Sequence, residues 1–132
     1  MKQICSPLRS MPLLAIIAFC QGCANGPAFR GPIQFSANTE IVIVRATARR
    51  KTDGILVGGD VRRTNGYAGP VPGHLHVVGL DNSGNVVAIT DAPWGAFMSR
   101  RFRLAYFMAY LRAANSASIT KITIEPVTPP TR

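Results

Sequence analysis

Residues 99–115, SRRFRLAYFMAYLRAAN, decide whether this chain is an all-β protein or a mixed one. Their alanine, leucine, methionine and arginine content favours a helix, and Asn115 is a residue type that can end one. In a strand, the same segment would place two sets of side chains on opposite faces. One set comprises Phe102, Leu104, Tyr106, Met108 and Tyr110, and the other comprises Arg103, Ala105, Phe107, Ala109 and Leu111. Aromatic side chains suit a sheet, so we predict a strand and keep a helix as the alternative.

The segments around it are rich in β-branched residues or alternate between polar and apolar ones. Strands are predicted at 39–48, 54–63, 73–81, 85–90 and 116–126. Asp81-Asn82-Ser83-Gly84 is a turn signal that joins two of them as a hairpin. The Gly58-Gly59 pair interrupts another strand and indicates a bulge or a close backbone approach. About six to seven short strands separated by turns predict a small antiparallel β-sandwich over residues 39–126.

The order of these strands is similar to that of the small immunoglobulin-like domains of bacterial envelope proteins. In those domains a strand ends in a hydrophobic–x–hydrophobic–Asp–x–x–Gly turn, and residues 78–84, VGLDNSG, have this form. A later strand of the type around Arg103–Leu111 is then followed by a closing Ile-x-Ile strand, Ile122–Ile124. The resemblance implies an immunoglobulin-like sandwich and no particular activity, because these motifs are structural.

The first 22 residues have the order of a secretory signal peptide. Lys2 and Arg9 give a basic start, residues 13–19, LLAIIAF, form an uninterrupted apolar run, and small residues follow. The apolar run is much shorter than the roughly 20 residues that a membrane-spanning helix needs. We therefore predict a cleaved signal over 1–22 and export from the cytoplasm, with an unprocessed amino terminus as the alternative.

Residues 20–23, CQGC, resemble the lipobox of bacterial prolipoproteins. In that family the invariant cysteine receives a diacylglycerol, and the peptide before it is removed. Cys20 and Gln21 depart from the usual leucine and small residue, and ordinary signal cleavage after Ala24 is the alternative. The resemblance implies a fatty-acylated lipoprotein anchored through Cys23. Since alanine and not aspartate follows the cysteine, it also implies the outer membrane, with the domain facing the periplasm.

The segments that flank the predicted sandwich show no period. Residues 23–38 hold two Gly-Pro pairs, so we predict that they form a flexible tether between the anchor and the domain. Residues 127–132 are predicted to be a proline-rich tail. Trp94 lies in the loop DAPWGAF, and we expect it to plug one end of the sandwich in preference to forming a contact surface.

The chain carries a formal net charge of +9, and arginine supplies most of the positive charge. The basic residues gather in three clusters, namely Arg49, Arg50 and Lys51; Arg62 and Arg63; and Arg100, Arg101 and Arg103. In an exported protein the abundant anions are phosphates of lipid headgroups and lipopolysaccharide, and cell-wall carboxylates, with which guanidinium groups pair well. We predict anionic glycans or lipids and other envelope proteins as partners, and no nucleic acid. The alternative is a solvated surface that keeps the protein soluble.

His74 and His76 share one face of a predicted strand, about 7 Å apart. Two imidazoles at this spacing are able to share a copper or zinc ion if a further ligand joins them. The side chains available as that ligand are Asp60, Asp81, Asp91, Met98 and Met108. No spacing motif singles one of them out. A periplasmic copper- or zinc-binding protein is therefore the alternative function, and a pair of plain surface histidines is the structural alternative to it.

The sequence predicts no catalytic site and no cofactor. Its serines lie in tether, turn or loop contexts, no G-x-S-x-G motif is present, and the six acidic residues form no close pair. An acylated Cys23 would have no free thiol. We therefore expect a non-catalytic cell-envelope lipoprotein with a binding or assembly role at the membrane surface.

Overall fold

The computed structural model describes residues 26–65, 70–97 and 103–130. These ranges contain seven β-strands and one short 3-10 helix. The elements are β1 (Ile33–Phe35), β2 (Ile41–Lys51), β3 (Gly54–Arg63), β4 (His74–Leu80), β5 (Val86–Ala92), β6 (Leu104–Arg112), η1 (Ser116–Ser118) and β7 (Lys121–Val127). No helix within the same ranges has the length and hydropathy that crossing a membrane requires.

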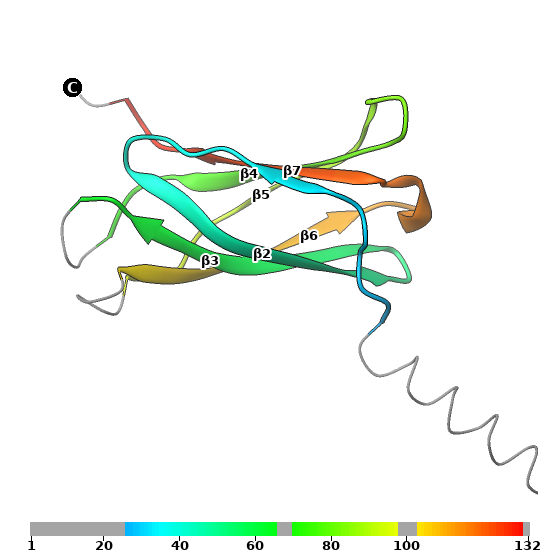
Figure 1. The fold of residues 1–132 in the computed structure, drawn as a ribbon, viewed down its shortest axis with the longest axis horizontal. Coiled ribbons are helices and arrows are strands. Elements are labelled where there is room, and N and C mark those ends of the chain that lie inside the picture. The colour runs from blue at the N-terminus through cyan, green and yellow to red at the C-terminus, as the bar shows by residue number, and fades with distance from the viewer. Residues whose placement is uncertain (1–25, 66–69, 98–102, 131–132) are drawn as a thin grey trace, which may run out of the picture.

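The strands form two sheets that pack face to face (Figure 1). One sheet has four strands in the order β1-β7-β4-β5, and the other has three strands in the order β2-β3-β6. Neighbouring strands are antiparallel except β1 and β7, which run parallel. The predicted all-β sandwich is confirmed, with four strands in one sheet and three in the other.

The segment that decides the fold class forms strand β6. Its inward side chains are buried, and the outward ones between them are more exposed. Ala109 pairs with Val57 of β3, and Leu111 pairs with Ile55. A helix would turn part of the inward apolar set to solvent, so burial between the sheets outweighs the helix propensity of this composition. The predicted strand is confirmed, and the helix alternative is wrong.

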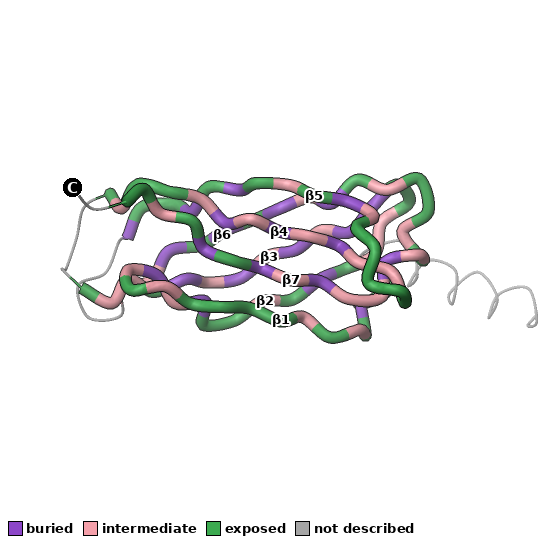
Figure 2. The backbone as a smooth tube through the Cα atoms, turned by 90° about the horizontal axis from the view of Figure 1, so that it is seen from above, coloured by how far each residue is buried: buried purple, intermediate pink, exposed green. Residues whose placement is uncertain are grey.

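Alternate side chains of both sheets fill the space between them. Figure 2 shows buried residues recurring along the strands between more exposed ones. The largest fully buried side chains are those of Phe107, Ile41, Ile55, Leu75, Leu111, Ile119, Ile122, Ile124, Val57, Val61 and Val77. No polar or charged side chain among the described residues is buried. Apolar packing therefore holds the domain together, at about 1.5–3 kcal/mol for each fully buried aliphatic side chain.

A bulge in β2 lies opposite Val61 and Asp60 of β3, next to the glycine pair. The strand register shifts between Ile43 and Arg45, so that Val44 is the extra residue. A methyl group on Gly59 would lie 1.9 Å from the carbonyl oxygen of Arg45. Only a glycine allows two backbones to come this close, so the irregularity predicted for the glycine pair is confirmed and is centred on Gly59.

The segment before β2 is part of the sandwich, contrary to the flexible tether predicted over 23–38. From residue 26 on, this segment first lies beside β2, where the N–H of Phe29 donates to the carbonyl of Ala48 at 2.9 Å. Phe29 itself is only 8% exposed. The chain then crosses to the other sheet, where β1 pairs with β7. The Gly-Pro pairs therefore shape a fixed crossing between sheets, and the tether prediction is wrong for residues 26–38.

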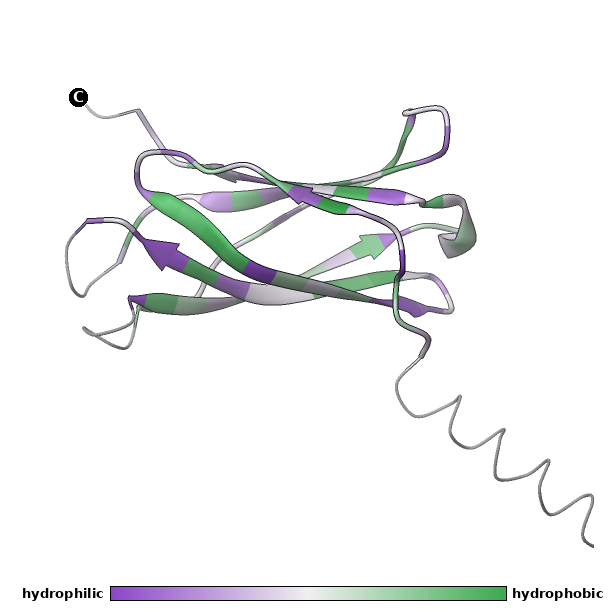
Figure 3. Ribbon diagram, in the orientation of Figure 1, coloured by the Kyte–Doolittle hydropathy of each residue, from purple (hydrophilic) through white to green (hydrophobic). Residues whose placement is uncertain are grey.

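The two ends of the sandwich carry different connections (Figure 1). The β2–β3 hairpin, the β4–β5 turn and η1 lie at the end where residue 26 enters, which we call the entry end. The loops that follow β1, β3 and β5 lie at the opposite, distal end. Figure 3 shows the apolar start of β2 beside the hydrophilic end of β3 there. Trp94 is buried at this distal end, and its Nε1 donates to the carbonyl of Val71 at 2.9 Å, so the predicted plug is confirmed.

Candidate ligand-binding face

The outer surface of the three-stranded sheet carries alternate residues of β2, β3 and β6, aligned in rows by the strand register. From the distal end to the entry end, the rows are Val42–Arg62–Leu104, Arg45–Asp60–Tyr106, Thr47–Gly58–Met108, Arg49–Leu56–Tyr110 and Lys51–Gly54–Arg112. Most of the residues between these positions are buried, so the rows face solvent, and Val44 at the bulge is the exposed exception. We call this surface the arginine–tyrosine face and define it by Arg45, Arg49, Arg62, Arg112, Tyr106, Met108 and Tyr110.

Four arginines and one carboxylate give the arginine–tyrosine face a positive charge. Arg45 is paired with Asp60, with 2.9 Å between Nη2 and Oδ2. Within the described ranges, Arg49, Arg62 and Arg112 have no acidic side chain at ion-pair distance. A surface ion pair contributes only about 0–1 kcal/mol, so Arg45 also remains available to an anionic ligand.

Exposed aromatic and sulfur-containing side chains lie between these arginines. Tyr106 and Met108 are each 54% exposed. Gly58 lies opposite Met108 at the centre of the sheet, and a methyl group on it would be 3.0 Å from the hydroxyl oxygen of Tyr106. The missing side chain at Gly58 therefore leaves room for the tyrosine ring. Large exposed apolar side chains gathered in one patch are typical of a binding surface.

Tyr110 is fixed on the face by a hydrogen bond that its hydroxyl donates to Asp53 in the β2–β3 turn. This bond lowers the pKa of Asp53 below its usual value and raises the pKa of Tyr110 above its usual value. The guanidinium carbon of Arg112 lies 5.9 Å from the centre of the Tyr110 ring, at cation–π distance. The entry-end part of the face thus combines an oriented aromatic ring with a cation.

Strand alternation separates basic residues that are neighbours in the sequence. Arg49 and Arg62 lie on the arginine–tyrosine face, and Lys51 lies at its entry-end edge. Arg45 and Arg112 also belong to the face, although the sequence did not single them out. The alternating stretch R-A-T-A-R over residues 45–49 is the signal that points to Arg45, because its charged residues fall on one side of a strand.

Arg50 points away from the face and has a structural role, contrary to the predicted ligand-binding one. Its guanidinium donates hydrogen bonds to the carbonyl of Ser116 and, at 3.1 Å, to the carbonyl of Ile119. It also lies 5.2 Å from the centre of the Phe29 ring. Arg50 therefore joins β2 to η1 and to the entering chain, and its charge is used within the fold.

Two further arginines bind backbone groups at the distal end. Arg63 Nε donates to the carbonyl of Asn65 at 2.7 Å, and its guanidinium lies 5.6 Å from the Phe97 ring centre. Arg103 donates to the carbonyl of Thr64 at 3.1 Å. Both hold the loop after β3 and lie off the arginine–tyrosine face. The predicted ligand-binding residues that fall outside the described ranges are Arg100 and Arg101.

His74 and His76 converge on Asp91 of β5. The distances to the same Asp91 oxygen are 2.7 Å from His76 Nδ1 and 3.7 Å from His74 Nε2. The hydrogen bond from His76 lowers the pKa of Asp91 below its usual value. Across residues 26–65, 70–97 and 103–130, no group of three or more His, Cys, Asp or Glu side chains is arranged to hold a metal ion. The geometry describes a polar surface cluster and does not support the predicted copper or zinc site.

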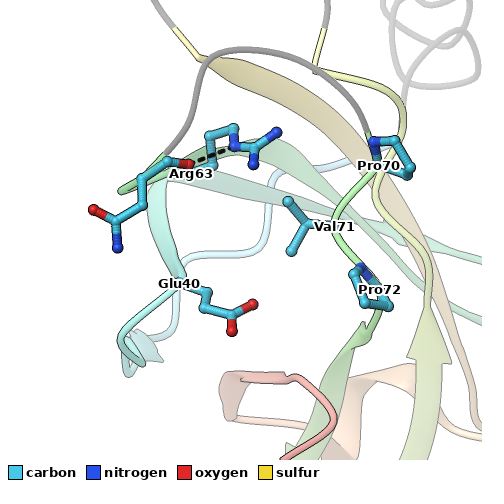
Figure 4. A pocket seen from close by; sticks show the side chains of 6 residues that line it. Glu40, Arg63, Pro70, Val71 and Pro72 are labelled. Carbon is cyan, nitrogen blue, oxygen red and sulfur yellow. Dashed lines mark hydrogen bonds between the residues drawn. The ribbon is translucent and has the colours of Figure 1, made fainter. Parts of the chain in front are cut away.

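A hollow of about 290 Å³ opens at the distal end. Figure 4 shows Pro70–Pro72 on one side of it and Glu40 and Arg63 on the other. Arg63 is turned toward the carbonyl of Asn65, to which it is hydrogen-bonded. Because this arginine is already engaged, the hollow offers a ligand mainly the Glu40 carboxylate, Asn65 and apolar ring surface. The arginine–tyrosine face remains the stronger candidate.

Comparisons with protein-family models, with curated proteins and with solved structures each found no match for this chain. The proposals that follow therefore rest on its own residues.

Proposed function

We propose that this protein is a non-catalytic lipoprotein of the cell envelope that binds anionic glycans or lipid headgroups through the arginine–tyrosine face. The observation that carries the proposal is the set of arginines around the exposed ring of Tyr106 and the half-buried ring of Tyr110 on one sheet surface. Guanidinium groups pair with phosphates and carboxylates through two parallel hydrogen bonds. Tyrosine rings offer flat apolar surface to sugar rings. Lipopolysaccharide, with phosphates attached to sugars, has both chemistries.

The envelope location rests on the amino terminus, which lies outside the described residues. The signal-like order of residues 1–22 supports export, and the lipobox-like Cys20–Cys23 supports acylation of Cys23. Ala24 after that cysteine supports sorting to the outer membrane. An exported, anchored domain would meet phosphate-bearing lipids and glycans at high local concentration.

The non-catalytic part of the proposal rests on where the titratable groups lie. The shifted pKa values of Asp53, Tyr110 and Asp91 have hydrogen bonds between exposed side chains as their main cause. Catalytic groups usually owe such shifts to burial and to charges in a cleft. No polar or charged side chain is buried in the part of the chain that the structure describes. Surface contacts of the fold therefore explain these shifts better than an active site does.

Binding of the full-length protein, purified from membranes in detergent, to lipopolysaccharide tests the proposal. The key variant replaces Arg49 and Arg62 by glutamine, which removes two guanidinium groups from the face while keeping polar side chains. Since a charged hydrogen bond is worth about 1.5–3 kcal/mol, we expect Kd to rise by roughly tenfold or more. Added salt should also weaken binding of the unmodified protein, because it screens exposed charges.

The matched control replaces Lys121 by glutamine and is compared with the single variant Arg49→Gln. It removes the same charge from a residue that does not project from β2, β3 or β6. We expect Lys121→Gln to bind lipopolysaccharide nearly as tightly as the unmodified protein does, and Arg49→Gln to bind it more weakly. If the two single variants lose affinity equally, net charge and not the face holds the ligand, and the proposal fails.

A further inference from the structure

Backbone hydrogen bonds hold the entering chain against β2 from Pro27 to Phe29. The carbonyl of Pro27 accepts a hydrogen bond from the N–H of Arg50 at 2.8 Å, and the N–H of Phe29 donates to Ala48 at 2.9 Å. The ring of Phe29 is buried. From Pro27 to Phe29 the path of the chain is therefore fixed to the entry-end half of β2.

Only a short covalent path separates this fixed point from the predicted lipid. Cys23 lies four Cα–Cα steps before Pro27, and a fully extended chain of that length spans about 14 Å. A longer tether would let the domain turn freely above the membrane. This one keeps the entry end within a few headgroup diameters of any lipid on Cys23.

Gly26 enters directly beside the β2–β3 hairpin. A methyl group on it would lie 2.4 Å from the Arg50 carbonyl oxygen and 4.0 Å from Lys51 Cδ. The residues that line the open hollow at this point include Gly26 and Pro27 of the entering chain and Lys51, Thr52 and Asp53 of the hairpin. The hairpin and the entering chain therefore make one continuous surface at the entry end.

Positive charge predominates on this surface. Lys51 and Arg112 share the last row of the three-stranded sheet, and Arg30 is exposed in the entering chain. The carboxylate of Asp53, which lies among them, is hydrogen-bonded to Tyr110. Cations held near a bilayer are attracted by anionic lipids within a Debye length of its surface.

We infer that the entry end docks on anionic headgroups of the bilayer that holds the Cys23 lipid, an inference that rests on the proposed acylation. The short covalent path and the charge of the entry end point to the same orientation. In that orientation strands β2, β3 and β6 run roughly perpendicular to the membrane, which we call the upright orientation. Arg62 then lies at the end of the face that is farthest from the membrane. The arginine–tyrosine face is then open sideways to envelope polymers.

Fluorescent labels on two matched threonines test this orientation. Thr52 is exposed in the β2–β3 turn, and Thr39 is exposed in the loop before β2. Each is changed to cysteine in the full-length protein, which is purified from membranes, labelled and reconstituted into phosphatidylglycerol–phosphatidylcholine vesicles that carry a headgroup quencher. Because β2 separates the sites by about 30 Å, at roughly 3.3 Å per residue, we expect quenching at Thr52→Cys to be at least about threefold stronger. Equal quenching, or stronger quenching at Thr39→Cys, overturns the inference.

Two further measurements on the same samples distinguish the contribution of anionic headgroups from that of the lipid anchor. Omitting phosphatidylglycerol should lower the quenching ratio toward one, and a ratio that does not change overturns the part assigned to anionic headgroups. Intact mass spectrometry reports acylation of Cys23 directly. An acylated protein with equal quenching overturns the orientation alone, whereas an unacylated protein overturns the proposed anchor and this inference together.

Discussion

Arg49 and Arg50 are adjacent in the chain, and the alternation of β2 sends their side chains to opposite sides of the sheet. Arg49 faces solvent on the arginine–tyrosine face. Arg50 bonds the carbonyls of Ser116 and Ile119 and lies over Phe29. One arginine is therefore free to bind a ligand, and the other holds three segments together.

This division predicts different costs for the same substitution. Arg50→Ala removes the hydrogen bonds to the carbonyls of Ser116 and Ile119 and the contact with Phe29, so we expect it to lower the free energy of unfolding by about 2–3 kcal/mol. Arg49→Ala removes only solvated surface, and its effect should stay within about 0.5 kcal/mol. Urea unfolding of both variants, followed by tryptophan fluorescence, measures the difference. Equal effects would mean that the Arg50 hydrogen bonds contribute nothing to stability.

The hydrogen bond between Tyr110 and Asp53 should make part of the stability depend on pH. Because the bond lowers the pKa of Asp53, Tyr110→Phe should raise that pKa toward its usual value. A carboxyl with a lowered folded-state pKa stabilises the protein above its unfolded-state pKa, and the contribution is lost as pH falls through the folded-state value. The stability difference between the unmodified protein and Tyr110→Phe should therefore be present at neutral pH and disappear in acid. Carboxyl NMR titration of Asp53 in both proteins checks the shift, and identical curves would contradict it.

Hydrophobic alternation identifies individual strands better than it identifies their ends. Strand β3 begins and ends at the predicted residues 54 and 63. Strand β2 was predicted over 39–48 and runs over Ile41–Lys51, because pairing across the two-residue turn at 52–53 continues through three basic residues. Because these three residues are polar, they do not continue the apolar alternation from which the strand was predicted. Pairing with β3, and not the sequence of β2 alone, determines where β2 ends.

The two glycines in β3 should respond differently to the same substitution. Gly59→Ala would place a methyl group 1.9 Å from the Arg45 carbonyl, where only backbone movement brings relief. We expect it to cost about 3 kcal/mol or more, or to prevent folding. Gly58→Ala meets the hydroxyl end of the exposed Tyr106 side chain at 3.0 Å and the Phe107 carbonyl oxygen at an ordinary 3.5 Å, so its effect should stay within about 1 kcal/mol. Thermal unfolding compares the two, and a Gly59→Ala protein as stable as Gly58→Ala would contradict the close backbone approach at the bulge.

Contacts between segments that are distant in the chain could not be predicted from the sequence. β1 is three residues long and lies after Gly-Pro pairs, and its partner β7 comes about ninety residues later. No local sequence pattern predicts that β1 pairs with β7. The candidate face shows the same limit, since its seven residues come from β2, β3 and β6 and were grouped only when the register was known. Clusters in the linear sequence mixed outward arginines with inward ones such as Arg50.

The entering chain supplies the prediction that tests the whole-molecule arrangement. Phe29 and Phe35 both lie in the segment predicted to be a tether, but Phe29 is 8% exposed and Phe35 is 46% exposed. Phe29→Ala would empty a buried site and remove the ring beneath Arg50, so we expect a loss of about 3–5 kcal/mol in the free energy of unfolding. Phe35→Ala should cost less than about 1 kcal/mol, because much of its ring is already in water. Urea unfolding of the full-length variants measures both. If residues 26–38 were a free tether, neither substitution would change stability. An unchanged free energy of unfolding for Phe29→Ala would therefore show that the entering chain does not pack on the sandwich. The short path from Cys23 to the domain, on which the upright orientation at the membrane depends, would then be lost.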